Sequence, residues 1–341
     1  MDSLTHVTLG ACLGNVTLGK PLGKPALLWG AAAQNLPDID GVANLWLPTS
    51  EGLLAHRGLT HSLPVGLVAA VCLALLAHRG QRTTGVSVWQ WLLFFVVQLG
   101  VHDLLDTANA YGTGLLEPFS HERFSAHLLY VIDPLFTLPL LISTLVLAAS
   151  SHRSTQNRAW AVGGLCGALL YLAGAFVTKT ITSQGIQQSL SAARLPATQF
   201  LCTPTPFNSL LWYAVATDTA GYHVGYRSVF EGPQHTTRFT FFPQRQSLLT
   251  QGSPSAEVAR LVRFANGYYV VEQDEEGLMI DVLRFGQAGG WQHPHAPFVF
   301  RYQLRNEAAN RLVVQRGRFE GWSRPVLIAY VRRMFNYDPT P

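Results

Sequence analysis

The feature that most constrains this 341-residue chain is a set of long apolar stretches confined to its first half. A helix needs about 20 consecutive apolar residues to cross the roughly 30 Å hydrocarbon core of a bilayer. Four stretches are candidate membrane spans: 63–77, 88–101, 128–149 and 159–177. Two shorter apolar pieces, 7–18 and 26–36, are either spans packed inside a bundle or re-entrant helices. We therefore predict a mainly α-helical membrane bundle with four to six spans.

The composition also indicates a membrane protein. Only 13% of residues are charged and 48% are hydrophobic, whereas charged residues make up about 25% of an ordinary soluble domain. This balance argues against a disordered chain, a coiled coil or an ordinary cytosolic enzyme. The net charge of +4 is too small to indicate nucleic-acid binding, so no nucleic-acid partner is expected. The four cysteines lack CxxC spacing, which argues against a disulfide framework or a thiolate zinc site.

Residues 181–341 differ in character from the first half. Short segments with alternating or β-branched residues are separated by turns rich in Gly, Pro and Asn, which is typical of strands. These segments are 236–242, 268–272 and 298–304. We predict a water-facing, β-rich (α+β) soluble domain over 181–341, following a membrane-embedded domain over 1–180. Residues 178–193 also fit the continuation of a helix, so the boundary lies within that segment.

Basic residues predict the topology. They occupy alternate connections between the apolar stretches, at Lys20, Lys24, Arg79, Arg82, Arg153 and Arg158. The positive-inside rule places these connections in the cytoplasm. The connections at 37–61 and 104–133 then face outward and, with six spans, so do both termini. The C-terminal domain is therefore expected on the periplasmic side of a multi-pass membrane protein.

Histidine and aspartate residues gather at the edges of the apolar stretches. The set is His6, Asp38, Asp40, His56, His61, His102, Asp103 and Asp106. Ionisable groups at such positions are costly to desolvate, so they are candidates for function. The topology was derived from Lys and Arg alone, yet it places all eight on the same outward side.

The spacing of these residues suits metal ligation. His102 and Asp106 are four residues apart at a predicted helix end, which puts both side chains on one face. Gly58 lets a turn bring the imidazoles of His56 and His61 to a common centre. The predicted ligands are His6, Asp38, Asp40, His56, His61, His102 and Asp106. Neutral imidazole with carboxylate suits zinc, manganese or iron, and we predict one to three divalent ions, zinc or alternatively manganese.

Each motif taken alone has a plainer interpretation. The His102 and Asp106 pair could be a helix cap or a local hydrogen bond. Asp38 and Asp40 could be turn residues that follow Pro37. His56 and His61 could be histidines at the membrane interface. The position of all these groups on one side of a chain poor in charge favours the metal site.

An ordered series of motifs in the first half resembles a known family. The motifs are MDSLTHVTLG with Gly14, NLPDID, HRGLTHS, HDLLD followed by Tyr111-Gly112-Thr113, PFS with Arg123-Phe124, and Ile132-Asp133-Pro134. In this combination residues 1–180 resemble the bacterial inner-membrane metal-dependent hydrolases described as LexA-regulated. The resemblance implies a membrane-bound hydrolase without naming its substrate. The His/Asp pattern is also distantly similar to zinc-dependent phospholipase C and the related single-strand nucleases.

Ligands at the ends of spans would place metal ions near the depth of lipid headgroups. We therefore predict hydrolysis of a phosphoester, in a lipid or lipid-linked headgroup, at the outer face of the cytoplasmic membrane. Asp40 is the predicted general base. Arg57 either clamps a phosphate oxygen or, in the alternative, reaches a lipid phosphate or pairs with Asp103. Asp103 is predicted to orient a ligand histidine without binding the ion itself.

The competing class is a non-catalytic, metal-stabilised membrane scaffold or envelope-stress protein. A structural metal site is coordinatively closed, whereas a catalytic site keeps a position open for water. The surplus of candidate ligands and the adjacent Arg57 favour catalysis. Peptide hydrolysis is less favoured because no HExxH motif is present;. Transport is less favoured because the polar groups lie at one face and not at the midplane.

Overall fold

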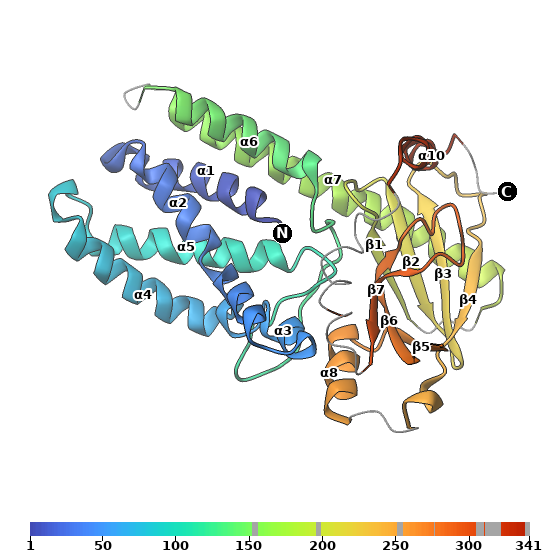
Figure 1. Ribbon diagram of the computed structural model, residues 1–341. Helices are drawn as coiled ribbons and strands as arrows, with labels where there is room; N and C mark the ends of the chain where they lie inside the picture. Colours follow the sequence, from blue (N-terminus) through green and yellow to red (C-terminus); the bar gives the residue numbers. More distant parts are fainter. Residues whose placement is uncertain are drawn as a thin grey trace. The chain divides into compact units, whose positions relative to one another are not determined.

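The computed structural model describes residues 1–151, 156–195, 199–250, 255–275, 277–304, 310 and 322–337 (Figure 1). The chain forms two compact units. The first comprises Met1–Ala43 and Ala55–Gly174, and the second comprises Asn44–Leu54 and Ala175–Pro341. The first unit is helical and the second contains both sheets, so the predicted order of a helical part followed by a sheet-containing part is confirmed.

The first unit is built on a bundle of helices. Its long helices are α1 (Ser3–Leu22), α2 (Pro25–Asn35), α4 (Leu63–Gly80), α5 (Val88–Asp106), α6 (Pro134–Ala149) and the first half of α7 (Asn157–Ala192). Its short connecting elements are η1 (Pro37–Leu45), η2 (Leu59–His61) and η3 (Arg82–Thr84), whereas nearly all of α3 (Thr49–Ala55) belongs to the second unit. Helix α1 packs against α2, α5 and α6, and α4 packs against α5 (Figure 1).

Three of the described helices are long and apolar enough to cross a membrane, namely α4, α5 and α7. The predicted count of four to six spans is not confirmed. Helix α6 is apolar but has 16 residues, because it starts later than the predicted stretch at 128–149. The carboxylate of Asp133 accepts hydrogen bonds from the backbone N–H groups of Leu135 and Phe136, which caps the helix at Pro134. Arg153, one of the basic residues used for the topology, lies outside the described residues.

Glycines bring α1 and α2 into close contact. A Cβ atom on Gly30 would lie 1.9 Å from the carbonyl oxygen of Gly10. Small residues at a helix crossing let two backbones approach in this way. Two glutamines connect the pair to α5: the amide of Gln98 donates to the Gly10 carbonyl over 3.2 Å, and that of Gln34 donates to the Gln98 carbonyl over 2.7 Å. These contacts hold α1, α2 and α5 together beside His102.

The second unit contains two antiparallel sheets. The first has the order β1 (Phe200–Pro204), β2 (Leu211–Thr217), β3 (Gly221–Ser228), β4 (Phe239–Pro243), and the second has the order β5 (Tyr269–Asp274), β6 (Gly277–Gln287), β7 (Phe298–Gln303). The unit also holds η4 (Gln246–Thr250), α8 (Ser255–Ala265) and α10 (Arg324–Met334). The predicted strand segments correspond to β4, β5 and β7. The predicted domain boundary at residue 180 falls inside α7, which continues to Ala192.

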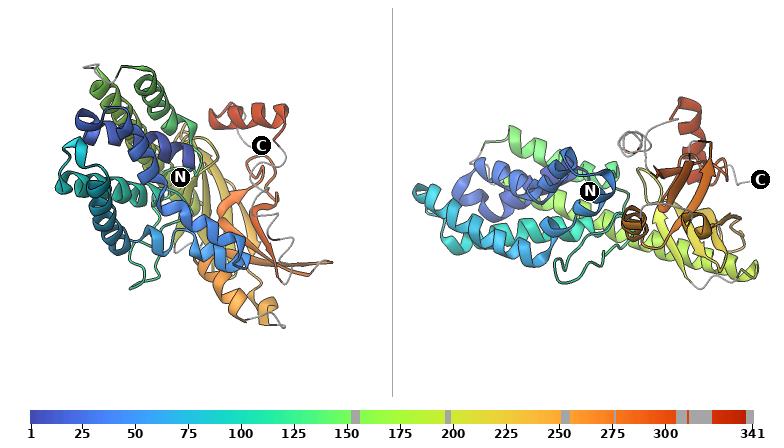
Figure 2. Two further views of the ribbon diagram at one scale, coloured as in Figure 1. Left: turned by 60° about the vertical axis from the view of Figure 1, so that its left-hand side comes forward. Right: turned by 60° about the horizontal axis from the view of Figure 1, so that its bottom comes forward.

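Strand β2 shows why the first sheet is buried on both faces. Successive side chains of a strand point to opposite faces. Trp212 and Ala214 pack on one face with Ile186 from the second half of α7. Tyr213 packs on the other face with Leu283 of the second sheet, and Figure 2 shows the strands of the two sheets beside each other. A strand that is covered on both faces is typically a continuous run of apolar residues. The sequence of β2 is such a run.

Candidate metal centre

The predicted site residues come together in the first unit from four separate segments. His6 lies in the first turns of α1, and Asp38 and Asp40 lie in η1, directly after Pro37. His56 and Arg57 follow α3, and His61 ends η2. His102, Asp103 and Asp106 lie in the last turns of α5. The cluster is therefore at the ends of helices and not in their middle.

Four side-chain atoms converge on a common centre. They are Asp38 Oδ1, His61 Nε2, His102 Nε2 and Asp106 Oδ2, and all lie within 4.8 Å of one another. His61 Nε2 is 3.3 Å from the Asp38 oxygen and 3.5 Å from the Asp106 oxygen, and His102 Nε2 is 3.9 and 3.7 Å from the same two atoms. Ligands bound about 2.0–2.2 Å from a tetrahedral ion are about 3.3–3.6 Å apart. Two of the four distances fall in this range and the other two lie slightly above it, so the four atoms are spaced nearly as a single ion of that kind requires.

Two of these four atoms lack a partner. Within the described part of the chain, His61 Nε2 and His102 Nε2 are buried without a hydrogen bond, whereas Asp106 Oδ2 forms an ion pair with Arg57 Nε over 2.9 Å. His61, His102 and Asp106 are all 0% exposed. Leaving a buried polar atom unsatisfied costs about 1–3 kcal/mol, so two at one point require an explanation. An ion at their centre would give each of them a partner.

The other ring nitrogens of the two histidines hold the imidazoles in place. His102 Nδ1–H donates to the backbone carbonyl oxygen of Gln34, and His61 Nδ1 lies 3.2 Å from Asp40 Oδ2. Histidines that bind metals are oriented by a carbonyl or carboxylate in this way. With the proton on Nδ1, each Nε2 is an acceptor directed at the centre.

Asp40 contacts several groups at once. Its Oδ1 lies 2.8 Å from His56 Nδ1, and its Oδ2 accepts from the backbone N–H of Arg57 over 2.9 Å and from the hydroxyl of Thr60 over 2.7 Å. These contacts occupy most of its acceptor positions and suit an orienting role better than the predicted general-base role. Asp38, Asp40 and His56 also form a second group of convergent ligand atoms.

Arg57 is buried and paired with the cluster. Its side chain lies 2.9 Å from Asp106 through Nε, and its Nη1 donates to Asn109 Oδ1 over 2.8 Å. The guanidinium also lies over the ring of Tyr111, 5.1 Å from the centroid. Of the predicted alternatives, the ion pair is the one present, but its partner is Asp106 and not Asp103.

The turn between the two histidines has an unexpected conformation. Arg57 has a φ of +58°, whereas Gly58 has a φ of −92°. A left-handed backbone costs a residue with a Cβ about 1–2 kcal/mol, so the sequence suggested Gly58 as the flexible position. The contacts of the Arg57 side chain and its N–H bond to Asp40 offset this cost. Strain of this kind gathers at functional sites.

His6 and Asp103 lie beside the four-atom group and not in it. His6 stacks on His102 with ring centroids 4.0 Å apart, and its Nε2 is 3.3 Å from Asp106 Oδ1. Asp106 Oδ1 is not among the four convergent atoms, which include Asp106 Oδ2 instead. The Oδ1 atom of Asp103 is buried and has no hydrogen bond in the described ranges.

Two supporting residues were missed from the sequence. Gln34 contacts both His6 and His102, and Asn109 accepts from Arg57. Gln34 is a polar residue near the end of an apolar piece, which is a signal of the same type that identified the histidines. Asn109 follows Asp106 by three residues, and its position alone gives no such signal.

Without a metal, the pKa values of two residues of the cluster are shifted far from their ordinary values. Burial would lower the pKa of His61, but the nearby carboxylates of Asp106, Asp38 and Asp40 raise this pKa to about 10. Burial would raise the pKa of Asp38, but His61 and His102 lower it to about 2. The metal-free cluster therefore holds a proton on His61 at neutral pH, and an incoming cation has to displace that proton.

The displaced proton leads to a pH prediction. Between pH 7 and pH 9, below the His61 pKa of about 10, the affinity for a divalent ion is expected to rise about tenfold per pH unit, with about one proton released per ion. Calorimetric titration in buffers of different ionisation enthalpy measures this release. An affinity independent of pH would show that His61 does not bind the ion.

The same shift affects the stability of the metal-free protein. The pKa of His61 lies above its ordinary value of 6.5. Its protonation therefore stabilises the fold fully below about pH 6.5, and this contribution is lost as the pH rises toward 10.

The fold and this cluster define a helical membrane protein with a His/Asp site at the helix ends. Residues 1–182 match the family described as YdjM inner membrane protein. This match covers more than half of the 341 residues, and the chain belongs to that family. Its presence in the inner membrane follows from this membership together with the three candidate spans.

Two relatives support the same placement. The inner membrane protein YbcI of Escherichia coli is 34% identical over 126 residues, which cover 36% of this chain and 70% of YbcI. The uncharacterized protein YfhP of Bacillus subtilis is 34% identical over 142 residues, which cover 39% of this chain and 42% of YfhP. The match thus spans less than half the length of YfhP. No solved structure matches the chain.

Proposed function

We propose that this chain is a metal-dependent hydrolase that cleaves a phosphoester, in a lipid or lipid-linked headgroup, at the periplasmic face of the inner membrane. The observation that carries the proposal is the convergence of the buried atoms His61 Nε2, His102 Nε2 and Asp106 Oδ2, of which the two histidine nitrogens have no hydrogen bond within the described residues. Such atoms are expected where an ion binds.

Charge and chemistry both suit a divalent ion. Asp38, Asp40, Asp103 and Asp106 carry four negative charges, and Arg57 and the amino group of Met1, both paired with Asp106, carry two positive charges. Two negative charges remain when the histidines are neutral. One dication balances them. Nitrogen and carboxylate ligands suit zinc, or alternatively manganese. The second group, Asp38, Asp40 and His56, supports a second ion that shares Asp38 with the first.

Solvent reaches the cluster on the side of Asp38 and His56. The side chains of His61 and Asp106 are 0% exposed, whereas those of Asp38 and His56 are 20% and 27% exposed. A substrate would therefore approach past Asp38 and His56. This partial opening favours a catalytic site over a closed structural one. The position at the ends of α1 and α5 supports a headgroup substrate, since the ends of spans lie near headgroup depth.

Each neighbouring residue has a role in this proposal. A divalent ion held here would supply Lewis acidity, which lowers the pKa of a water molecule and neutralises phosphoryl oxygens. Asp103, with a buried oxygen that has no hydrogen bond in the described residues, accepts the proton of the attacking water. Arg57 and His6 hold Asp106, and Asp40 holds His61.

Metal removal tests the proposal. Chelation of the detergent-purified full chain is expected to lower turnover of a p-nitrophenyl phosphoester and of short-chain phospholipids at least a hundredfold, and zinc or manganese should restore it. Metal binding without turnover would favour the competing scaffold function. In that case the ion would still raise the unfolding free energy, by about 2.7 kcal/mol at a hundredfold excess over Kd.

A further inference from the structure

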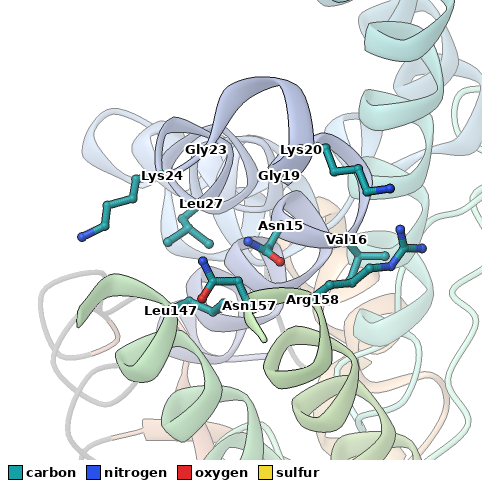
Figure 3. Close-up of a pocket in the computed structure, with 10 residues that line it drawn as sticks. All are labelled: Asn15, Val16, Gly19, Lys20, Gly23, Lys24, Leu27, Leu147, Asn157 and Arg158. Carbon is teal, nitrogen blue, oxygen red and sulfur yellow. The ribbon is translucent and has the colours of Figure 1, made fainter. Parts of the chain in front are cut away.

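A second polar feature of the first unit is a cavity of about 400 Å³ between the end of α1, the start of α2, the end of α6 and the start of α7 (Figure 3). Its polar lining residues are Asn15, Lys20, Lys24, Asn157 and Arg158. Figure 3 shows the amides of Asn15 and Asn157 near each other, and the charged ends of Lys20 and Arg158 on one side of them. The metal centre uses none of these residues.

The charge of this cavity is not balanced. Three cations line it and no carboxylate does. The sequence has no Asp or Glu in residues 3–37 or 134–217, which include the helices that form the cavity. Lys24 Nζ donates to the carbonyl oxygen of Ala148 over 2.8 Å, which holds it at the end of α6. Lys20, Lys24 and Arg158 are all exposed, so their charges are accessible, and a cavity of this composition attracts an anion.

The position of the cavity indicates the source of the anion. Lys20 follows His6 by 14 residues in α1, so the cavity lies about 20 Å from the metal centre along the helix axis. It lies where α6 ends and α7 begins, at the opposite end of the bundle. Spans end near the lipid headgroups, and basic pockets between membrane helices bind anionic headgroups.

We propose that this cavity binds the phosphate of an anionic phospholipid. Lys20 and Arg158 supply the charged donors, and a guanidinium can bind two phosphate oxygens at once. The amides of Asn15 and Asn157 supply neutral donors. The first turn of α7 adds the positive end of its helix dipole. This binding site is independent of the proposed hydrolase activity.

Native mass spectrometry of the full chain in detergent tests the site with phosphatidylglycerol and phosphatidylcholine as probes. Phosphatidylglycerol is expected to bind more tightly, and Lys20→Gln and Arg158→Gln are each expected to weaken its binding about fivefold. Arg82→Gln is the matched control, because Arg82 is an exposed basic residue in η3 at the same end of the bundle but outside the cavity. It should leave binding unchanged.

Three results would overturn the proposal. An equal loss in Arg82→Gln would show a diffuse surface charge and no specific site. Equal binding of the two lipids would show that the net negative charge of the headgroup is not recognised. Inorganic phosphate that displaces the lipid at equal concentration would identify a soluble anion as the ligand. Unchanged thermal unfolding of Lys20→Gln and Arg158→Gln would confirm that a lost affinity does not arise from misfolding.

Discussion

Replacing His102 with alanine is expected to remove the bound divalent ion and to lower phosphoester turnover at least a hundredfold. Its Nε2 is one of the four convergent ligand atoms and has no hydrogen bond in the described structure. Loss of a residue that only supports a ligand already costs 10–100-fold, so loss of a ligand should cost more. Elemental analysis and turnover assays on the same purified samples measure both quantities.

Two further variants show whether the loss of metal and turnover is specific to the removal of a ligand. His121→Ala also removes an imidazole, but this side chain is 64% exposed and pairs with Glu117; it should keep both metal and turnover. Asp103→Asn should keep the metal and lose turnover if Asp103 accepts the proton of water. Metal retained at full occupancy in His102→Ala would refute the site described above.

Replacing Arg57 with alanine is expected to destabilise the metal-free protein by about 3–5 kcal/mol. Arg57 is 2% exposed and Asp106 is 0% exposed, and the two side chains are 2.9 Å apart. Removing one partner of a buried ion pair carries a penalty of about this size. The amino group of Met1 and the protonated His61 still face Asp106, so the loss is expected at the lower end of this range. Unfolding of the detergent-solubilised protein in the presence of a chelator measures the loss.

A double-mutant cycle separates the ion pair from other effects of this substitution. If the pair accounts for the loss, Arg57→Ala combined with Asp106→Asn should recover part of the stability, because no buried charge is left alone. Arg57→Ala with unchanged stability and a raised KM for the phosphoester would instead support the phosphate clamp that the sequence also suggested.

The separation into a helical part and a sheet-containing part followed from the sequence because it depends on local patterns. Apolar runs without charges indicate membrane helices, and alternating segments between turns indicate strands. The apolar stretch at 128–149 is longer than α6 because a hydropathy pattern does not detect a cap. Asp133 and Pro134 begin the helix within an apolar stretch, and a polar side chain bonded to backbone N–H groups decides such a boundary.

The sequence by itself determined which residues gather at the site, since ionisable groups at the edges of apolar segments are too costly to place there without a partner. Only the tertiary structure separated Asp38, His61, His102 and Asp106, with convergent ligand atoms, from their supports. His6 and Asp40 are of the same residue types, yet they contact the ligands instead, as Arg57 does. The physical reason is that spacing along the chain sets which side chains share a helix face. The direction of each ring nitrogen or carboxylate oxygen depends on hydrogen bonds from segments distant in sequence, such as that of Gln34 with His102.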